Sequence, residues 1–345
     1  MYNFVFTILF SCSTNIDMPM DPVVPDPTVQ LEQNGSTPDE NESPNGSTPD
    51  ENESPNGSTP DENESSNGSI QECTTNGGYA DDEGLKSWCW SDVTIPSEGF
   101  FNNDQLFINQ HCNTGMVTGL ADRVYFKVNP TTPSAQNCGS VTYNYRAEIR
   151  DSPSDVNHPV GTEQWWGFDY RFGDNYIPDE LPWIIWQTHG SFSNPGNPMT
   201  SLQVCATDFA GQTNKRGELL VSNSALSWPN QKFVPTGIVP QAGQTINIVI
   251  HLIWGDNNTG LYQVWVDGVK VYDEQERTVY EEQPMGGYWK IGIYKWRWKH
   301  QSNVNSSASL GIRELNTSIG PLKVIKKSPG NSTYLANEYN TVKPN

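Results

Sequence analysis

Basic residues are absent from the first 69 positions of this 345-residue sequence. The same stretch holds 13 of the 40 acidic residues, which leaves 27 acidic against 20 basic residues in the rest of the chain. The formal net charge of -20 therefore belongs largely to the N-terminal region, and the remainder carries about -7. A net acidic chain without a recognisable nucleic-acid-binding module indicates no nucleic-acid partner.

Long apolar runs are also missing. The N-terminal stretch MYNFVFTILFSC is too short to span a bilayer and has the length of a signal-peptide core. Its ending, Leu9-Phe10-Ser11-Cys12, resembles a bacterial lipobox, although no Lys or Arg precedes it. We predict that residues 1–12 are a lipoprotein signal peptide and that Cys12 is lipidated, which anchors the exported protein in the outer membrane at the cell surface. Plain secretion is the alternative.

Residues 13–72 contain no pattern that builds a hydrophobic core. The unit NGSTPDENESP occupies residues 34–44, recurs at 45–55 and, with one change, at 56–66. No apolar residue recurs in it, which excludes a solenoid. Its Pro, Gly, Ser, Asn and acidic residues are typical of a solvated, self-repelling chain. We predict a disordered linker that holds the folded domain ~40 Å or more from a surface.

Cysteine and histidine patterns for metal binding are lacking. No C-x-x-C pair and no His-bracketed spacing occurs, so we expect no zinc site. The Asp256-Asn257-Asn258 turn has oxygen ligands for calcium, but a plain Asn/Asp turn explains it better, and we expect no required cofactor. In an exported protein the cysteines after Cys12 are expected to oxidise, and their odd number leaves one free. They are Cys73, Cys89, Cys112, Cys138 and Cys205.

No window of helical length shows a convincing period of 3.6 residues. From about residue 73 onward, short alternating runs are broken by Gly, Pro, Asn and Asp. Asp267-Gly268 between two such runs is typical of a type I′ hairpin, and Gly255–Gly260 of a longer turn. We predict one all-β domain at residues 73–345, a monomer, with a single antiparallel jelly-roll β-sandwich over roughly residues 73–325. The clearest strands are Val124–Val128, Thr142–Arg150, Trp165–Phe172, Trp183–His189, Ile246–Trp254, Tyr262–Val266 and Val269–Tyr272.

Three further patterns place polar and aromatic groups on one side of a strand. In Tyr288–His300, Ile291 and Ile293 fall on one side, and the other side carries Lys290, Gly292, Tyr294, Trp296 and Trp298. This basic, aromatic strand in an acidic protein indicates a site for an anionic, ring-shaped ligand. An amphipathic strand with packed tryptophans and solvated lysines is the alternative.

The other two strands show the same alternation. Arg146, Glu148 and Arg150 share one side, where Glu148 between two arginines predicts a structural ion-pair ladder. In Trp183–His189, Gln187 and His189 share a side with Ile185, opposite Trp186. We expect the polar sides of all three strands to face one concave sheet surface.

These three segments, in this order, resemble the motifs of the jelly-roll polysaccharide lyases, the group of alginate, glucuronan, heparin and ulvan lyases. The matching motifs are Arg-x-Glu-x-Arg at Arg146–Arg150, Gln-x-His at Gln187–His189 and Lys-x-Gly-x-Tyr at Lys290–Tyr294. The resemblance does not cover the chain before about residue 120 or after about residue 320. It implies β-elimination in a concave groove that binds an anionic, uronic-acid-containing polysaccharide.

The resemblance also implies roles for individual residues. Tyr294 and His189 match the catalytic pair, and His158 is a reserve for the histidine. Arg146 and Gln187 would stabilise the charge that develops on the substrate carboxylate when the C5 proton leaves. We expect Lys290 and Arg146 to lower the pKa of Tyr294, so that Tyr294 acts as base, with Tyr294 or His189 as acid. The expected substrate-binding residues are Gln187, Arg146, Lys290, Arg150, Trp296 and His158.

Two other functions are compatible with the same fold. A glycoside hydrolase needs two carboxylates about 5–10 Å apart, whereas Glu148 is the one carboxylate in the three polar strands. A carbohydrate-binding domain needs the aromatic residues but no Tyr–His–Gln set. Among lyase substrates we rank ulvan or another glucuronate-containing polymer first, because extra cations near Tyr294 suit sulfates. Alginate comes next, since tryptophans follow Tyr294 where alginate lyases tend to have polar residues, and heparin-type glycans come last.

Overall fold

The structure is a computed structural model, and it describes the folded domain with short gaps. The predicted signal peptide with Cys12, the predicted linker, and Cys73, Cys112 and Cys138 lie outside the described residues. All described residues belong to one compact unit. They are residues 83–102, 105–110, 115–130, 145–151, 158–190, 198–225, 230–281, 286–331 and 337–345.

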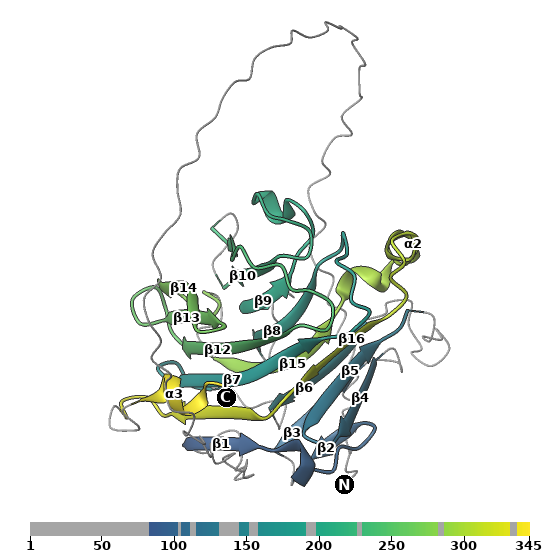
Figure 1. Ribbon diagram of the computed structural model, residues 1–345. Coiled ribbons are helices and arrows are strands. Elements are labelled where there is room, and N and C mark those ends of the chain that lie inside the picture. The colour runs from purple at the N-terminus through teal and green to yellow at the C-terminus, as the bar shows by residue number, and fades with distance from the viewer. Residues whose placement is uncertain are drawn as a thin grey trace, which may run out of the picture. The chain divides into compact units, whose positions relative to one another are not determined.

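Two antiparallel sheets make up the described part of the domain (Figure 1). The nine-stranded sheet has the order β14 (Val269–Gln275), β13 (Leu261–Val266), β12 (Thr245–Ile253), β7 (Glu163–Phe172), β16 (Leu315–Ile319), β5 (Arg123–Val128) and β4 (Gly115–Leu120), and β17 (Leu322–Lys327) joins β7 to β1 (Gly84–Trp88). The eight-stranded sheet has the order β11 (Lys232–Pro235), β10 (Leu219–Asn223), β9 (Thr200–Val204), β8 (Trp183–Gly190), β15 (Gly287–Tyr294), β6 (Arg146–Asp151), β3 (Leu106–Gln110) and β2 (Gly99–Phe101). This arrangement confirms the predicted antiparallel jelly-roll sandwich.

The hydrophobic core lies between the two sheets, because alternate residues of each strand point inward. From the nine-stranded sheet, β7 contributes Trp166, Phe168 and Tyr170, all fully buried. From the eight-stranded sheet, β15 contributes Ile291 and Ile293, as the sequence predicted. Full burial of one such side chain stabilises the fold by about 1.5–3 kcal/mol. The remaining residues of each strand, which alternate with the core residues, therefore form the outward faces of the two sheets.

The two predicted turns are confirmed. Asp267 and Gly268 have φ angles of 48° and 80°, the positive pair that a type I′ hairpin requires, and they join β13 to β14. In the longer turn the Asp256 carboxylate accepts hydrogen bonds from the backbone of Asn258 (2.9 Å) and of Thr259 (3.1 Å). These bonds account for the Asp256 side chain through ordinary turn chemistry.

Short helices complete the described fold. They are η1 (Trp90–Asp92), η2 (Phe209–Gly211), η3 (Trp296–Lys299), α2 (Gln301–Ser309) and α3 (Glu338–Val342). The sequence pattern did not predict α2 and α3. Val342 of α3 is fully buried on the outward face of the nine-stranded sheet, in a second apolar cluster with Trp165, Val249 and Ile325. In the described part of the chain, no helix has the length and apolar character needed to cross a membrane.

Candidate active site

The three polar strands lie side by side, with β15 between β6 and β8 (Figure 1). Tyr294 is opposite Arg146 on β6, and Lys290 is opposite Arg150 on β6 and Gln187 on β8. Tyr288 is opposite His189. Residues that are directly opposite in neighbouring strands project to the same side of a sheet. We call this outward surface the site face, formed by Arg146, Glu148, Arg150, Gln187, His189, Tyr288, Lys290 and Tyr294.

Two irregularities shape the site face. The pairing of β15 with β8 shifts between Ile291 and Tyr294, and that of β8 with β9 shifts between Ile184 and Trp186. The prediction that Ile185 shares a side with Gln187 and His189 is therefore wrong. A β-bulge places two successive residues against one partner and breaks the alternation. As a result Ile185 lies in the core, and Ile184 is opposite Tyr294.

Glu148 lies fully buried at the centre of the site face. One of its oxygens lies 2.7 Å from Arg146 Nε, and the other accepts a 2.5 Å hydrogen bond from Gln187 Nε2. The predicted structural role of Glu148 holds for its ion pair with Arg146, but Glu148 and Arg150 are not ion-paired, so the ladder has one rung and not two. Since Gln187 Nε2 faces a carboxylate, its Oε1 points elsewhere, and that atom has no hydrogen-bond partner in the structure. Arg150 Nη1 is also buried without a hydrogen-bond partner.

Aromatic rings flank the catalytic candidates. The guanidinium carbon of Arg146 lies 4.0 Å from the centre of the Tyr294 ring. Trp296 lies beside that ring, with 5.8 Å between the centroids. The prediction that Trp296 and Trp298 continue the strand is wrong, because β15 ends at Tyr294 and both tryptophans belong to η3. Trp298 consequently packs into the core, and Trp296 remains next to the site.

Tyr288 is a site residue that the sequence analysis missed. Its ring centroid is 5.8 Å from that of His189, 5.2 Å from Lys290 Nζ and 5.5 Å from the guanidinium carbon of Arg150. On the far side, Arg150 lies 4.3 Å from the Phe107 ring centre on β3. The signal was present, since Tyr288 has the same parity in β15 as Lys290 and Tyr294.

Burial sets the charge states on the site face. It lowers the pKa of His189 to about 3, and the nearby charge of Lys290 adds to this effect. Burial also lowers the pKa of Lys290 well below its usual value, assisted by Arg146. The expected lowering of the pKa of Tyr294 is wrong, because burial raises it and outweighs the opposing charge of Arg146. His189 and Tyr294 are therefore both neutral near pH 7.

The tautomer of His189 follows from its hydrogen bond. Its Nδ1 lies 2.8 Å from the backbone oxygen of Gly190. A carbonyl oxygen only accepts, so Nδ1 carries the proton. In a neutral imidazole the lone pair is then on Nε2. His189 is thus in the form that accepts a proton at Nε2, and Tyr294 in the form that donates one.

His158, the reserve candidate, lies on the other side of the sheet. Its Nε2 is 2.9 Å from Asp151 Oδ2, and Asp151 also accepts a hydrogen bond from the backbone of Trp289. Asp151 follows Arg150 directly, so its side chain points away from the site face. His158 is fully enclosed beside the Trp254 ring at 5.7 Å between centroids. His158 is therefore enclosed in the interior and bound to Asp151, and we do not include it in the site.

The described residues contain no group of three or more His, Cys, Asp or Glu side chains that would hold a metal ion. Of the two cysteines among them, Cys89 is disulfide-bonded and Cys205 is free and buried. Burial raises the pKa of the Cys205 thiol, which keeps it protonated and unreactive.

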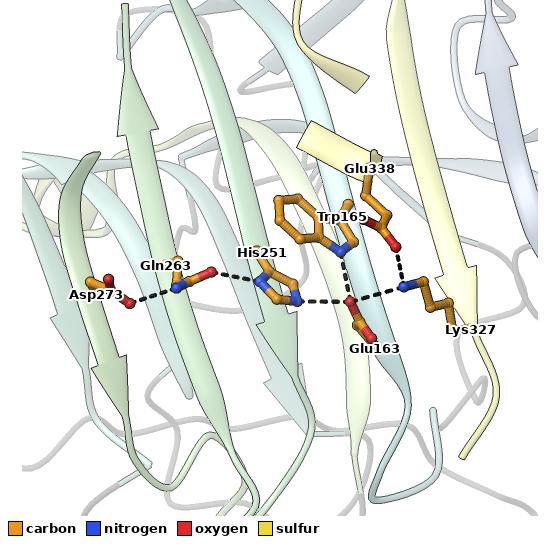
Figure 2. Close-up of polar contacts among 7 residues, drawn as sticks. All are labelled: Glu163, Trp165, His251, Gln263, Asp273, Lys327 and Glu338. Atoms are coloured by element: carbon orange, nitrogen blue, oxygen red, sulfur yellow. Dashed lines mark hydrogen bonds and ion pairs between the residues drawn. The ribbon is translucent and has the colours of Figure 1, made fainter. Parts of the chain in front are cut away.

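A second polar cluster lies on the outward face of the nine-stranded sheet (Figure 2). Glu163 Oε1 lies 3.0 Å from His251 Nε2 and accepts hydrogen bonds from Trp165 (2.8 Å) and Lys327 (3.4 Å). His251 Nδ1 lies 2.7 Å from Gln263 Oε1, and Gln263 donates to Asp273 at 2.5 Å. Lys327 also pairs with Glu338 of α3. We call these seven residues the Glu163 network; its polar atoms bond to one another.

The fold is an antiparallel β-sandwich, and the site face gathers arginine, glutamine, histidine, lysine and tyrosine side chains on one of its sheets. A family model described as polysaccharide lyase matches residues 101–310, which is more than half of the chain. The chain belongs to this family and is a polysaccharide lyase, as the three motifs predicted. No curated protein matches the sequence significantly.

Solved structures of lyases are similar to this chain. An endo-β-1,4-glucuronan lyase from the fungus Trichoderma reesei has 17% identity and a TM-score of 0.43, covering 68% of this chain and 95% of that chain. An alginate lyase from Alteromonas sp. 272 has 16% identity and a TM-score of 0.46, covering 68% and 99%. An alginate lyase from Pseudomonas aeruginosa has 19% identity and a TM-score of 0.42, covering 61% and 86%.

Proposed function

We propose that this polysaccharide lyase cleaves a uronic-acid-containing anionic polysaccharide by β-elimination on the site face. The observation that carries the proposal is the strand register, which brings Arg146, Gln187, His189 and Tyr294 to one side of three adjacent strands. The reaction needs a carboxylate clamp, a proton acceptor and a proton donor within reach of one sugar ring. These four side chains are of the required types.

Arg146 and Gln187 bind the carboxylate of the uronate. Glu148 holds Arg146 through Nε and Gln187 through one N–H, so the remaining donors of both side chains have a fixed direction. Donors that are already oriented stabilise the charge that develops as the C5 proton leaves, and each contributes on the order of 3–4 kcal/mol to lowering the barrier.

His189 and Tyr294 move the protons. His189 Nε2 takes the proton from C5, the C5–H electrons form the C4–C5 double bond, and the C4–O4 bond breaks. Tyr294 gives its proton to O4, and exchange with water restores both groups. The bound carboxylate adds negative charge, which raises the pKa of His189 from about 3 towards neutrality and keeps Tyr294 protonated. This reverses our expectation of Tyr294 as the base.

The substrate that we propose first is ulvan or another glucuronate-containing polymer, followed by alginate. Arg150 extends the cationic part of the site face beyond Arg146, which suits a second acidic group on the polymer. Among the cations that follow Tyr294 in the sequence, Lys295 does not face the polymer, because it is fully buried in an ion pair with Asp179. Fewer cations than the sequence suggests are therefore available for a sulfate.

A panel assay tests the proposed function. The wild-type protein is incubated with ulvan, glucuronan, alginate and heparin, and the product is followed by the ultraviolet absorbance of its C4–C5 double bond and by reducing ends. We expect absorbance and reducing ends to rise together on at least one polymer. Reducing ends without absorbance would indicate a hydrolase, and binding without either would indicate a carbohydrate-binding domain; both results contradict the proposal.

We further propose that the protein is exported and anchored to the outer membrane through Cys12, from the lipobox-like residues 9–12. In a bacterial host, Cys12→Ser is expected to move the protein from the membrane fraction to the soluble fraction. Equal membrane association of both forms would contradict the anchor.

A further inference from the structure

Tyr294 lies at a weak point of its strand. Upstream, the pairing with β8 skips from Ile291 to Tyr294, and Gly292 between them has a φ of 146°. A side chain at Gly292 would collide with the backbone oxygen of Ala147, 2.3 Å from an added Cβ. Downstream, the strand ends and η3 begins two residues later. The pairing with β6 is regular through Tyr294, but the pairing with β8 is interrupted just before it, so the ladder fixes Tyr294 regularly on one side only.

Lys295, the next residue, is held at three points. Its backbone N–H donates to the oxygen of Tyr145 at 2.8 Å, which extends the pairing of β15 and β6 by one bond. Its ammonium lies 2.5 Å from Asp179 Oδ2 and donates to the backbone oxygen of Leu181 at 2.5 Å. The side chains of Lys295 and Asp179 are 0% and 1% exposed. Both bonds of the ammonium reach the segment between β7 and β8.

The same carboxylate connects η3 and α2. Ser307 of α2 donates to Asp179 Oδ2 at 2.7 Å, and Trp298 of η3 donates to Ser307 at 2.8 Å. The ammonium of Lys295 lies 5.3 Å from the centre of the Trp298 ring. The segment that carries Trp296, which packs beside Tyr294, is thereby tied to the same buried charge pair.

Stability alone does not account for a charge pair at this position. Removing two charges from water costs several kcal/mol per ion, and a well-packed apolar pair of similar volume is often as stable or more stable. Burial lowers the pKa of Lys295 to about 8, against the opposing charge of Asp179. What a directional ion pair adds over apolar packing is a fixed position for the groups that it joins.

We propose that the buried Lys295–Asp179 pair is a positioning device that sets the location of the Tyr294 hydroxyl. Lys295 and Asp179 do not touch the substrate and act through Tyr294. The inference rests on the proposed function, since it takes Tyr294 as the proton donor. A displacement of about 1 Å in such a group lowers the rate by as much as about 100-fold.

The test compares two buried lysines. Lys295→Met removes the proposed device, and Lys327→Met removes a lysine of the Glu163 network that is also ion-paired, has 8% of its side chain exposed and lies on the other sheet (Figure 2). Turnover is measured on the most active polymer of the four-polymer panel, for folded protein at a temperature below both unfolding transitions. We expect Lys295→Met to lower kcat about 10- to 100-fold with KM within about twofold, and Lys327→Met to leave kcat within about twofold.

A milder variant and a crystal structure complete the test. Asp179→Asn keeps the shape of the side chain and is expected to lower kcat about 3- to 10-fold in case Lys295→Met does not fold. The crystal structure of either variant is expected to show the Tyr294 hydroxyl displaced by about 1 Å. An unmoved hydroxyl, an unchanged kcat, or an equal loss in Lys327→Met overturns the inference. If the wild type acts on none of the four polymers, the proposed function fails. The inference is then tested only by whether the Tyr294 hydroxyl is displaced in the crystal structures of the variants.

Discussion

The outward faces of the two sheets carry the same kinds of polar residues, but these residues differ in how many of their polar atoms have hydrogen-bond partners. On the nine-stranded sheet, both nitrogens of His251 have partners and the Glu163 network is closed (Figure 2). On the site face, Gln187 Oε1 and Arg150 Nη1 are buried without a hydrogen-bond partner. An unsatisfied buried polar atom costs about 1–3 kcal/mol and is rare in native proteins. The comparison distinguishes a closed network, which stabilises the fold, from an incomplete one on the sheet that carries the candidate site.

The largest expected difference between the two faces is at their histidines. His189→Gln removes the proton acceptor and is expected to lower kcat about 10²- to 10⁴-fold. His251→Gln breaks the Glu163 network, and we expect it to leave kcat within about twofold while lowering the free energy of unfolding by about 1–3 kcal/mol. Steady-state kinetics and urea unfolding measure the two effects. Comparable kcat losses in both variants would contradict the assignment of catalysis to the site face alone.

The two glutamates give the next largest difference. Glu148→Gln leaves Arg146 buried without its charge partner, and we expect it to lower kcat/KM about 10- to 100-fold and the stability by about 3 kcal/mol. Glu163→Gln on the other sheet should reduce stability only, because no group of the Glu163 network touches the site face. Kinetics and thermal unfolding of the two variants check this pair. Unchanged kcat/KM in Glu148→Gln would show that Glu148 does not hold the carboxylate clamp.

Two arginines separate binding from stability. Arg150→Met is expected to raise KM about tenfold with little change in kcat, since we propose that the Arg150 guanidinium attracts an acidic group away from the bond that breaks. Arg123, which pairs with Asp169 on the nine-stranded sheet, is the control, and Arg123→Met should leave KM unchanged. If KM responds equally to both substitutions, Arg150 does not bind the polymer.

The smallest expected effect is on the pH dependence of stability. The pKa of His189 is about 3 in the folded protein and 6.5 in its ordinary state. Since the folded pKa is the lower one, the unfolded chain binds the extra proton first. Stability is then fully present above about pH 6.5 and falls as the pH drops from 6.5 towards 3, by up to about 1.4 kcal/mol per unit. Urea unfolding at pH 7 and pH 5 should show a smaller difference in His189→Gln; an identical difference would contradict the burial of a neutral His189.

Alternation along single strands was enough to predict much of the fold and the site face. The predicted strands are present, with Thr142–Arg150 observed from Arg146 onward and residues 142–144 outside the described residues. The parity of Arg146 to Arg150 and of Lys290 to Tyr294 holds, and Ile291 and Ile293 enter the core. These features depend on neighbours two residues apart, which a sequence displays directly. The same parity also pointed to Tyr288.

The remaining features depend on contacts between distant segments. Bulges moved Ile185 into the core, and the end of β15 moved Trp298 there. His158 has Asp151 as a partner from another element, and Lys295 has Asp179. The pKa of Tyr294 was expected to fall because nearby charges are visible in the sequence, whereas the burial that raises it is not.

The central claim is that Tyr294, together with His189 and Arg146, performs the elimination on the site face. Its most direct test is the ultraviolet time course of two matched variants, Tyr294→Phe and Tyr288→Phe, which remove one hydroxyl each from half-buried rings on the same face of the same strand. The account predicts that Tyr294→Phe lowers kcat about 10²- to 10⁴-fold, whereas Tyr288→Phe stays within about tenfold. Full activity of Tyr294→Phe, or a greater loss in Tyr288→Phe, would contradict it.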